Sequence, residues 1–202
     1  MTKIKHKNYW KLILKADINR FEMNLSYWEK KTWFTDVDFC IIGSGIVGIS
    51  CALELRKQHP KAKILVLERG VLPQGASTKN AGFACFGSLS ELLSDLKTHA
   101  EDEVFDLVQQ RYTGLKLLRD TLGDRALKYQ QNAGYEVFLD HNKDLFHDCK
   151  SQIDDINSWL KPIFKDNVFQ IQKQTFGFKN CLSEIIVNPF EGQIDTGSMM
   201  KN

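Results

Sequence analysis

The sequence lacks the features that staple a small fold or hold it in a membrane. Its five cysteines are an odd number without CxxC spacing, which predicts neither a disulfide framework nor a metal site. Four prolines among 202 residues exclude a proline-rich disordered chain. The longest uncharged run, residues 39–53, has 15 residues, fewer than the roughly 18 to 20 that a membrane-spanning helix needs. We expect a globular, cytoplasmic chain without a transmembrane segment.

Charge of either sign is nearly balanced over the whole chain. Lys plus Arg number 27 and Asp plus Glu 25, so the net charge of +2 gives no reason to expect nucleic acid as a partner. Residues 1–20 hold six basic side chains and one acid, and residues 9–34 are rich in aromatic residues. Apolar side chains recur there at helical spacing. We predict an amphipathic lead-in, residues 1–36, that packs on the protein; binding to a membrane surface or to nucleic acid is less favoured.

A βαβ unit follows the lead-in. The apolar, β-branched run 37–42 predicts a buried parallel strand, and residues 46–59 contain good helix formers up to Pro60. A second apolar run at 63–68 predicts the next strand. The spacing of about 30 residues is the length that such a unit requires. We therefore predict a Rossmann-like α/β domain.

The turn between the first strand and the helix carries a GxGxxG sequence, residues 43–48. Gly43 permits a tight turn, Gly45 lets a pyrophosphate approach the backbone, and Gly48 lets the helix pack closely on the strands. Glu68 ends the second strand, where its carboxylate could accept hydrogen bonds from both hydroxyls of an adenosine ribose. Strand, helix and acid together predict a dinucleotide site; a glycine-rich turn without a ligand is the less favoured alternative.

The rest of the chain reads as a long glycine-marked loop, a helical insertion and a mixed α+β region. The loop spans residues 70–87, and the helical insertion completes a domain of residues 37–125. Residues 126–202 form the second region. The elements expected downstream are helices near 88–96, 102–122 and 143–164, strands at 135–139, 168–171 and 185–187, and a helix cap at Asp195 or Thr196.

From about Val37 to its end, and most strongly over residues 37–87, the chain resembles the D-amino-acid oxidase-like (DAO) family of FAD-dependent oxidoreductases. GSGIVG, the Glu-Arg-Gly after the second strand, and GASTKNAG at 75–82 match that family in order and spacing. The resemblance implies non-covalent FAD and, for residues 126–202, part of a substrate domain. The residues it implies for FAD binding are Gly43, Gly45, Ile46, Val47, Gly48, Glu68, Arg69, Ser77, Thr78, Asn80, Ala81 and Gly82.

The resemblance implies oxidation of a CH–NH bond in a small amine or amino acid by hydride transfer to the flavin. In that family the segment resembling residues 192–195 precedes a helix, and the chain then returns to complete the FAD-binding sheet and the substrate domain. That return is absent before Asn202, so no catalytic residue can be named and we expect this N-terminal portion to be inactive alone. The alternatives are a noncatalytic dinucleotide-binding subunit that needs a second polypeptide, and an NAD-binding protein.

Overall fold

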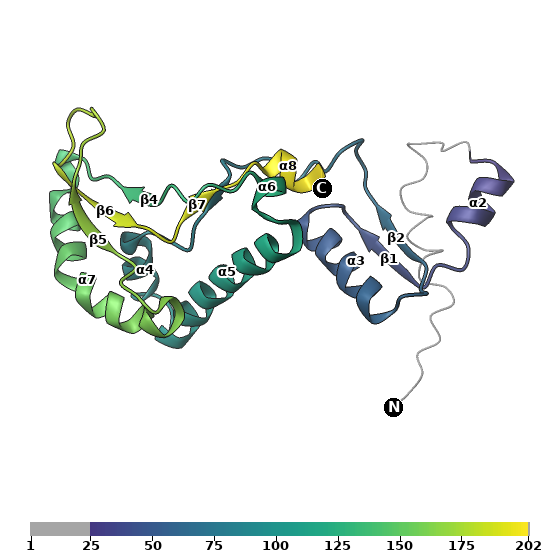
Figure 1. Cartoon of the computed structure of the whole chain (residues 1–202), viewed down its shortest axis with the longest axis horizontal. Helices are drawn as coiled ribbons and strands as arrows, with labels where there is room; N and C mark the ends of the chain where they lie inside the picture. The colour runs from purple at the N-terminus through teal and green to yellow at the C-terminus, as the bar shows by residue number, and fades with distance from the viewer. Residues whose placement is uncertain (1–24, 202) are drawn as a thin grey trace. The chain divides into compact units, whose positions relative to one another are not determined.

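The computed structural model describes residues 25–201, which belong to two compact units (Figure 1). The first unit ends at Arg69 and the second begins at Gly70. Most of the predicted lead-in, residues 1–24, lies outside the described residues. The domain boundaries predicted near residues 36 and 125 stay predictions.

The first unit is a single βαβ element preceded by a short helix. Its elements in chain order are α2 (Tyr27–Trp33), β1 (Phe39–Ile42), α3 (Ile46–Gln58) and β2 (Ile64–Leu67). The two strands pair in parallel, with Phe39 opposite Ile64 and Ile42 opposite Leu67. All three predicted elements of the βαβ unit are therefore present, with bounds within two residues of those expected. A parallel pair requires a crossover, and α3 supplies it.

No side chain in the described part of this unit is buried. Side chains of its apolar strands are of intermediate exposure at best, and Ile42 and Val47 are 72% and 80% exposed. A parallel sheet is normally covered on both faces, which is why its strands read as continuous apolar runs. The strands of the first unit therefore have the composition of buried strands, although their side chains are not buried.

The short helix α2 carries aromatic side chains of the predicted lead-in, and these are exposed; the prediction that the lead-in packs on the protein rests mainly on residues outside the described range. Tyr27, Trp28 and Trp33 are each more than half exposed. The helix is joined to the βαβ element through polar contacts instead, because the Lys63 ammonium donates to the carbonyl oxygens of Thr32 and Thr35, at 2.5 and 2.8 Å. A positive charge at the carboxyl end of a helix is favourable because the helix dipole is negative there.

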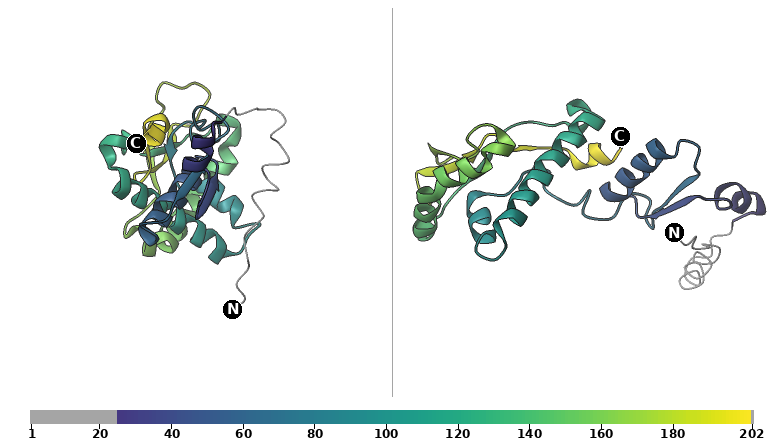
Figure 2. Two further views of the ribbon diagram at one scale, coloured as in Figure 1. Left: turned by 90° about the vertical axis from the view of Figure 1, so that its right-hand side faces the viewer. Right: turned by 90° about the horizontal axis from the view of Figure 1, so that it is seen from below.

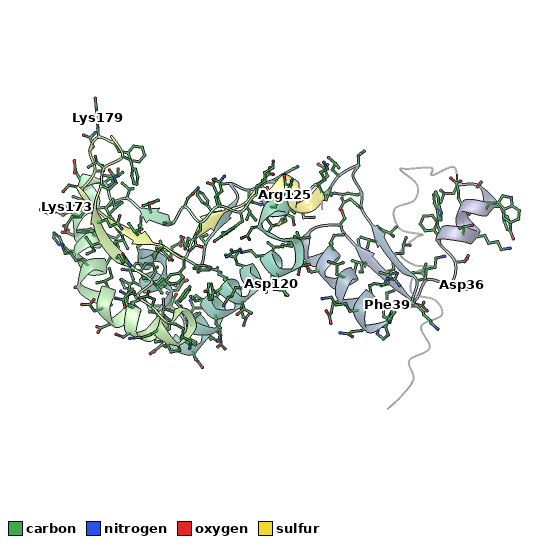
Figure 3. The ribbon with its side chains drawn as sticks, viewed as in Figure 1. Asp36, Phe39, Asp120, Arg125, Lys173 and Lys179 are labelled. Carbon is green, nitrogen blue, oxygen red and sulfur yellow. The ribbon has the colours of Figure 1, made fainter. Side chains whose placement is uncertain are left out.

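The second unit holds a three-stranded antiparallel sheet of order β4-β6-β5, and a separate two-residue antiparallel pair, β3 with β7 (Figures 1 and 2). Figure 3 shows Lys179 pointing outward at the tip of the connection between β5 and β6. The elements of this unit are β3 (Phe83–Ala84), α4 (Leu89–Asp95), α5 (Glu101–Leu122), α6 (Asp124–Leu127), β4 (Gly134–Glu136), a 3-10 turn η2 (Asp140–Asn142), α7 (Lys143–Phe164), β5 (Gln170–Lys173), β6 (Glu184–Asn188), β7 (Gly192–Gln193) and α8 (Thr196–Lys201).

Sequence signals account for several of these bounds. Ser88 and Glu91 form the predicted capping box at the start of α4: the Glu91 amide donates to the Ser88 hydroxyl and the Ser88 amide to the Glu91 carboxylate. Helix α7 has the predicted bounds. The predicted strand at 135–139 is shorter, because β4 ends at Glu136 and a 3-10 turn begins at Asp140.

The hydrophobic core lies in the second unit. Leu89, Phe146, Cys149 and Leu160 are among side chains that are at most 2% exposed. They come from α4 and α7, and further core side chains come from α5 and β6. Because burial of apolar area is the main driving force of folding, this unit contains the larger share of the stabilising contacts in the described chain.

One buried polar side chain connects α7 to the segment before β5. Asn157 is 4% exposed, and its Oδ1 accepts from the backbone amides of Val168 and Phe169, at 2.9 and 2.8 Å. Its Nδ2 donates to the Phe169 carbonyl oxygen at 2.9 Å. One side-chain amide thus forms hydrogen bonds with three buried backbone groups, which would otherwise be buried without partners.

Candidate functional site

The turn after β1 has the geometry that its glycines predict. Gly43 adopts a φ of +99°, a value that side chains other than glycine rarely tolerate. Its amide donates to the Leu67 carbonyl oxygen at 2.7 Å, so the last ladder bond of the parallel pair also fixes the start of the turn. The turn therefore follows directly from the strand pairing.

Gly48 allows the first turn of α3 to approach the backbone of that loop. A Cβ atom at this position would overlap the Gly43 carbonyl oxygen and would lie 3.3 Å from the Ile41 side chain. Backbone atoms cannot move aside as the end of a flexible side chain can. The close approach of helix and strand thus depends on the third glycine of the motif, as predicted.

Glu68 reaches from the end of β2 to the same turn. Its Oε2 accepts from both the amide and the hydroxyl of Ser44, each at 3.0 Å. The carboxylate is therefore placed beside the glycine turn by a residue that sequence reasoning left out of the site. The signal was available, because Ser44 is the residue between the first two glycines of the motif.

The amino end of α3 points its peptide dipoles toward this turn. Gly45 is the N-cap residue, no side chain caps the helix, and no acidic residue lies in its first turn. Ile46 and Val47 begin the helix with exposed side chains. A helix start of this kind is a ready anion-binding site, because the first amides and the macrodipole both favour negative charge.

The loop at residues 75–82 belongs to the second unit and is organised by its own hydrogen bonds. The Thr78 hydroxyl donates to the Pro73 carbonyl oxygen at 3.0 Å. The Asn80 side chain donates to the Ala76 carbonyl oxygen and accepts from the Gly82 amide, each at 2.8 Å. In this arrangement the Thr78 proton is used inside the loop rather than offered to a phosphate. Ser77 is half-covered, while Asn80 and Ala81 are exposed.

Gly82 ends that loop where two distant segments meet. Its φ is +76°, and a Cβ atom would overlap the Ile194 carbonyl oxygen. Its own carbonyl oxygen accepts from the Ile194 amide at 2.8 Å, next to the β3–β7 pair. The glycine is therefore required by chain packing inside the second unit.

The predicted site residues thus form two groups. Gly43, Gly45, Ile46, Val47, Gly48 and Glu68 come together at the carboxyl ends of β1 and β2 in the first unit, and Arg69 follows them with an exposed side chain. Ser77, Thr78, Asn80, Ala81 and Gly82 form a compact loop in the second unit.

The first group fits the adenosine and pyrophosphate parts of a dinucleotide. It offers a helix start without a side-chain cap, a turn in which glycines flank Ser44, and a carboxylate that already accepts two hydrogen bonds from an N–H and an O–H group. Within residues 25–201, no three His, Cys, Asp or Glu side chains are placed to hold a metal ion. No helix among these residues has the length and apolar character to cross a membrane.

Comparison with known families points to flavin enzymes. Residues 38–196 match the sequence model of the family DAO, described as FAD dependent oxidoreductase. Among curated proteins, the thiamine thiazole synthase of Chlamydomonas reinhardtii, a chloroplastic protein, is 30% identical over 122 residues, which cover 57% of this chain and 32% of that protein. Thiamine thiazole synthase 4 of Physcomitrium patens is 34% identical over 64 residues, or 32% and 18% of the two chains. The chain spans about a third or less of these relatives.

Solved structures show the same fold. Glycine oxidase from Geobacillus kaustophilus aligns with a TM-score of 0.56 at 17% identity, over 81% of this chain and 42% of that one. L-Amino acid deaminase from Proteus myxofaciens, solved in complex with anthranilate, aligns with a TM-score of 0.56 at 17% identity, over 82% and 35%. At this identity the likeness concerns the fold alone.

Proposed function

The chain belongs to the FAD dependent oxidoreductase family, and on that premise we propose that it binds FAD non-covalently and serves the oxidation of a small amine or amino acid. The observation that carries the proposal is that Gly43, Gly48 and Glu68 lie together at the ends of β1 and β2, which supports a dinucleotide site there. Support for the substrate class comes from the fold shared with glycine oxidase and L-amino acid deaminase.

In this proposal each residue of the turn has a separate task. The backbone at Gly45, Ile46 and Val47 holds the pyrophosphate at the start of α3. Glu68 accepts hydrogen bonds from the ribose hydroxyls, in exchange for the Ser44 hydroxyl that it accepts from in the structure. Arg69 lies beside the adenosine. A carboxylate at this place disfavours a 2′-phosphate by charge repulsion.

From the family resemblance we also propose that residues of the loop at 75–82 contribute to FAD binding. Small residues at Ala81 and Gly82 let a flat ring system lie against the backbone. Ser77, Thr78 and Asn80 shape that loop through its internal hydrogen bonds. When bound, the flavin supplies the redox chemistry and accepts a hydride from the substrate, while the protein supplies binding and orientation. We assign no catalytic side chain among the described residues.

The proposal is tested by titrating the purified chain with FAD and recording visible absorbance and flavin fluorescence. We expect FAD to bind and ADP to compete with it. FMN lacks the adenosine diphosphate and NAD lacks the flavin, so we expect each of them to bind at least tenfold more weakly than FAD. A soluble, folded chain that binds no FAD, or that prefers NAD, would contradict the proposal.

Glu68→Gln sharpens the same titration. The amide loses the negative charge and one acceptor position, so we expect at least tenfold weaker binding of FAD and of ADP. Glu54→Gln is the matched control, because Glu54 is an exposed acid on α3 that pairs with Lys57 at 3.8 Å. Equal affinities of both variants and the unmodified chain would remove Glu68 from the site.

A second candidate function is a noncatalytic dinucleotide-binding chain that works with a second polypeptide. It is favoured by the first unit, whose apolar side chains at Ile42 and Val47 remain exposed. Mixing the FAD-loaded chain with amino acids in the absence of oxygen separates the two candidates. Bleaching of the flavin absorbance supports the oxidoreductase; tight FAD binding without bleaching by any amine supports the second candidate. The cytoplasm remains our proposal for its location.

A further inference from the structure

A cavity inside the second unit is lined by acidic and amide side chains. Its volume is about 130 Å³, and Ser88, Gly134, Glu136, Asn188 and Glu191 contribute to its walls, together with apolar side chains. Apolar cavities on the order of 150 Å³ are known to take a benzene molecule, so this cavity has room for one small organic molecule or several waters. Its walls are too polar for a dry cavity.

Glu191 is held in place by the backbone around it. The side chain is 9% exposed, and its Oε1 accepts from the Phe86 amide at 2.9 Å. On the other side, the absence of a side chain at Gly134 makes room for the carboxylate, because a Cβ atom there would overlap Oε2 of Glu191. The position of this carboxylate is therefore built by two segments far apart in the sequence.

Glu136 brings a second carboxylate to the same cavity. It accepts from the hydroxyl of Ser90 and from the Ser90 amide, the latter at 3.5 Å, at the start of α4. Burial is the main cause that raises the pKa of both Glu136 and Glu191. The negative charges of Glu91 and Glu136 raise the pKa of Glu191 further. No Lys or Arg side chain is among the residues that line the cavity.

Asn188 supplies an unused donor. The residue is 5% exposed, and its Oδ1 accepts from the Phe190 amide at 3.1 Å. Its Nδ2 is buried and has no hydrogen-bond partner in the described structure, although the residue lines the cavity. A buried amide donor without an acceptor is unfavourable, so a molecule in the cavity that offers an oxygen atom would be stabilised there.

We propose that this cavity binds a small cationic amine that carries a neutral oxygen acceptor next to its ammonium group. The ammonium group is placed between Glu136 and Glu191, which together supply acceptors and negative charge, and the oxygen accepts from Asn188 Nδ2. A carboxylate on the ligand is disfavoured because two acids and no base line the cavity. Ethanolamine is the smallest simple compound of this class.

The ligand is tested by calorimetry on the full chain without added flavin, so that its failure is independent of FAD binding. Ethanolamine is the probe, ethylammonium lacks the oxygen, acetamide lacks the ammonium group, and glycine adds a carboxylate. We expect saturable binding of ethanolamine and at least tenfold weaker binding of the other three. No saturable binding of ethanolamine, or equal binding of acetamide, overturns the proposal, and the cavity then holds water.

Three variants assign the contacts. Glu191→Gln keeps an acceptor for the Phe86 amide but removes the charge, and it should weaken ethanolamine binding at least tenfold. Asn188→Asp keeps the acceptor for the Phe190 amide but removes the donor, and it should abolish the preference for ethanolamine over ethylammonium. Gly134→Ala displaces the Glu191 carboxylate and should remove binding.

Glu184→Gln is the matched control for these variants. Glu184 lies on β6, as Asn188 does, but it pairs with Lys150 at 3.1 Å and does not line the cavity. Circular dichroism and urea unfolding establish that each variant is folded. Ethanolamine binding that is unchanged in folded Glu191→Gln and Asn188→Asp overturns the proposed contacts and, with them, the site.

Discussion

The two units of the chain differ in how they use apolar residues. In the first, strands β1 and β2 are as apolar as buried strands, yet none of their side chains is buried. In the second, Leu89, Cys149, Leu160 and Ile185 are fully buried. The difference indicates that the strands of the first unit have the composition typical of a sheet covered on both faces, while the second unit contains its own core.

This difference also separates binding from stability. The first unit carries the glycine turn and Glu68, whose geometry is set by backbone approach and hydrogen bonds rather than by a core. A ligand that binds only the folded form stabilises it by an amount that grows with the logarithm of the ligand concentration divided by the dissociation constant. We therefore expect a ligand at the turn to matter most for the stability of the first unit.

The largest expected effect comes from a core truncation in the second unit. Leu160→Ala should lower the free energy of unfolding by about 2 to 5 kcal/mol, because a fully buried leucine leaves a cavity. Leu53→Ala on α3, where the side chain is 46% exposed, should change it by no more than about 0.5 kcal/mol. Urea unfolding followed by circular dichroism measures both. Equal losses in the two variants would erase the contrast between the units.

A polar core residue gives the next effect. Asn157→Ala removes three hydrogen bonds and leaves backbone groups of Val168 and Phe169 buried without partners. We expect a loss of about 3 kcal/mol in the same unfolding experiment. Asn132→Ala is the control, since Asn132 is exposed and its side chain donates to the Gln130 side chain at the surface. A loss below about 1 kcal/mol for Asn157→Ala would show that the helix and β5 segment do not depend on this amide.

The glycine turn gives an effect on binding. In Gly48→Ala the new Cβ atom meets the Gly43 carbonyl oxygen, so the turn must shift and FAD affinity should fall at least tenfold. Gly114→Ala in α5 has nothing within 4 Å of the new atom and should leave FAD binding unchanged. It should also raise the stability of the second unit by up to about 1 kcal/mol, the helix propensity difference between alanine and glycine. A flavin titration in which Gly48→Ala binds normally would contradict the role of this turn.

The smallest effect is a dependence of stability on pH. Burial raises the pKa of Glu191 above its ordinary value of 4.5. The folded form therefore binds this proton more tightly than the unfolded form, so the stabilisation is complete below pH 4.5 and is lost as the pH rises through the folded pKa. Urea midpoints of the unmodified chain should fall relative to Glu191→Gln as the pH is raised from 4.5. Parallel curves for the two proteins would contradict the burial of the Glu191 carboxylate.

Local signals in the sequence predicted most of the elements. Apolar runs predicted β1, β2 and β6, and the period of apolar residues predicted α7 from Lys143 to Phe164. The capping box of Ser88 was also readable, because its contacts span three residues. These features depend on neighbours in the chain, which is what a single sequence displays.

Contacts between distant segments could not be predicted. The Phe86 amide and the Glu191 carboxylate are 105 residues apart, and nothing local at either residue indicates the pairing. The β3–β7 pair has only two residues in each strand, too short to leave a period in the sequence. In the candidate site the glycine positions followed from the motif. The motif also contains Ser44, but its contact with Glu68, 24 residues away, was not predicted because it joins distant segments.

Hydrogen exchange of the full chain, with and without FAD, tests the central claim most directly. The account predicts that amides of β1, α3 and β2 exchange fast without FAD and become protected when FAD is added. Amides of α7 around Leu160 should be protected in both samples, since they lie in the core. If β1 and β2 are as protected as α7 without FAD, or if FAD changes neither unit, the claim that the first unit depends on its ligand is contradicted.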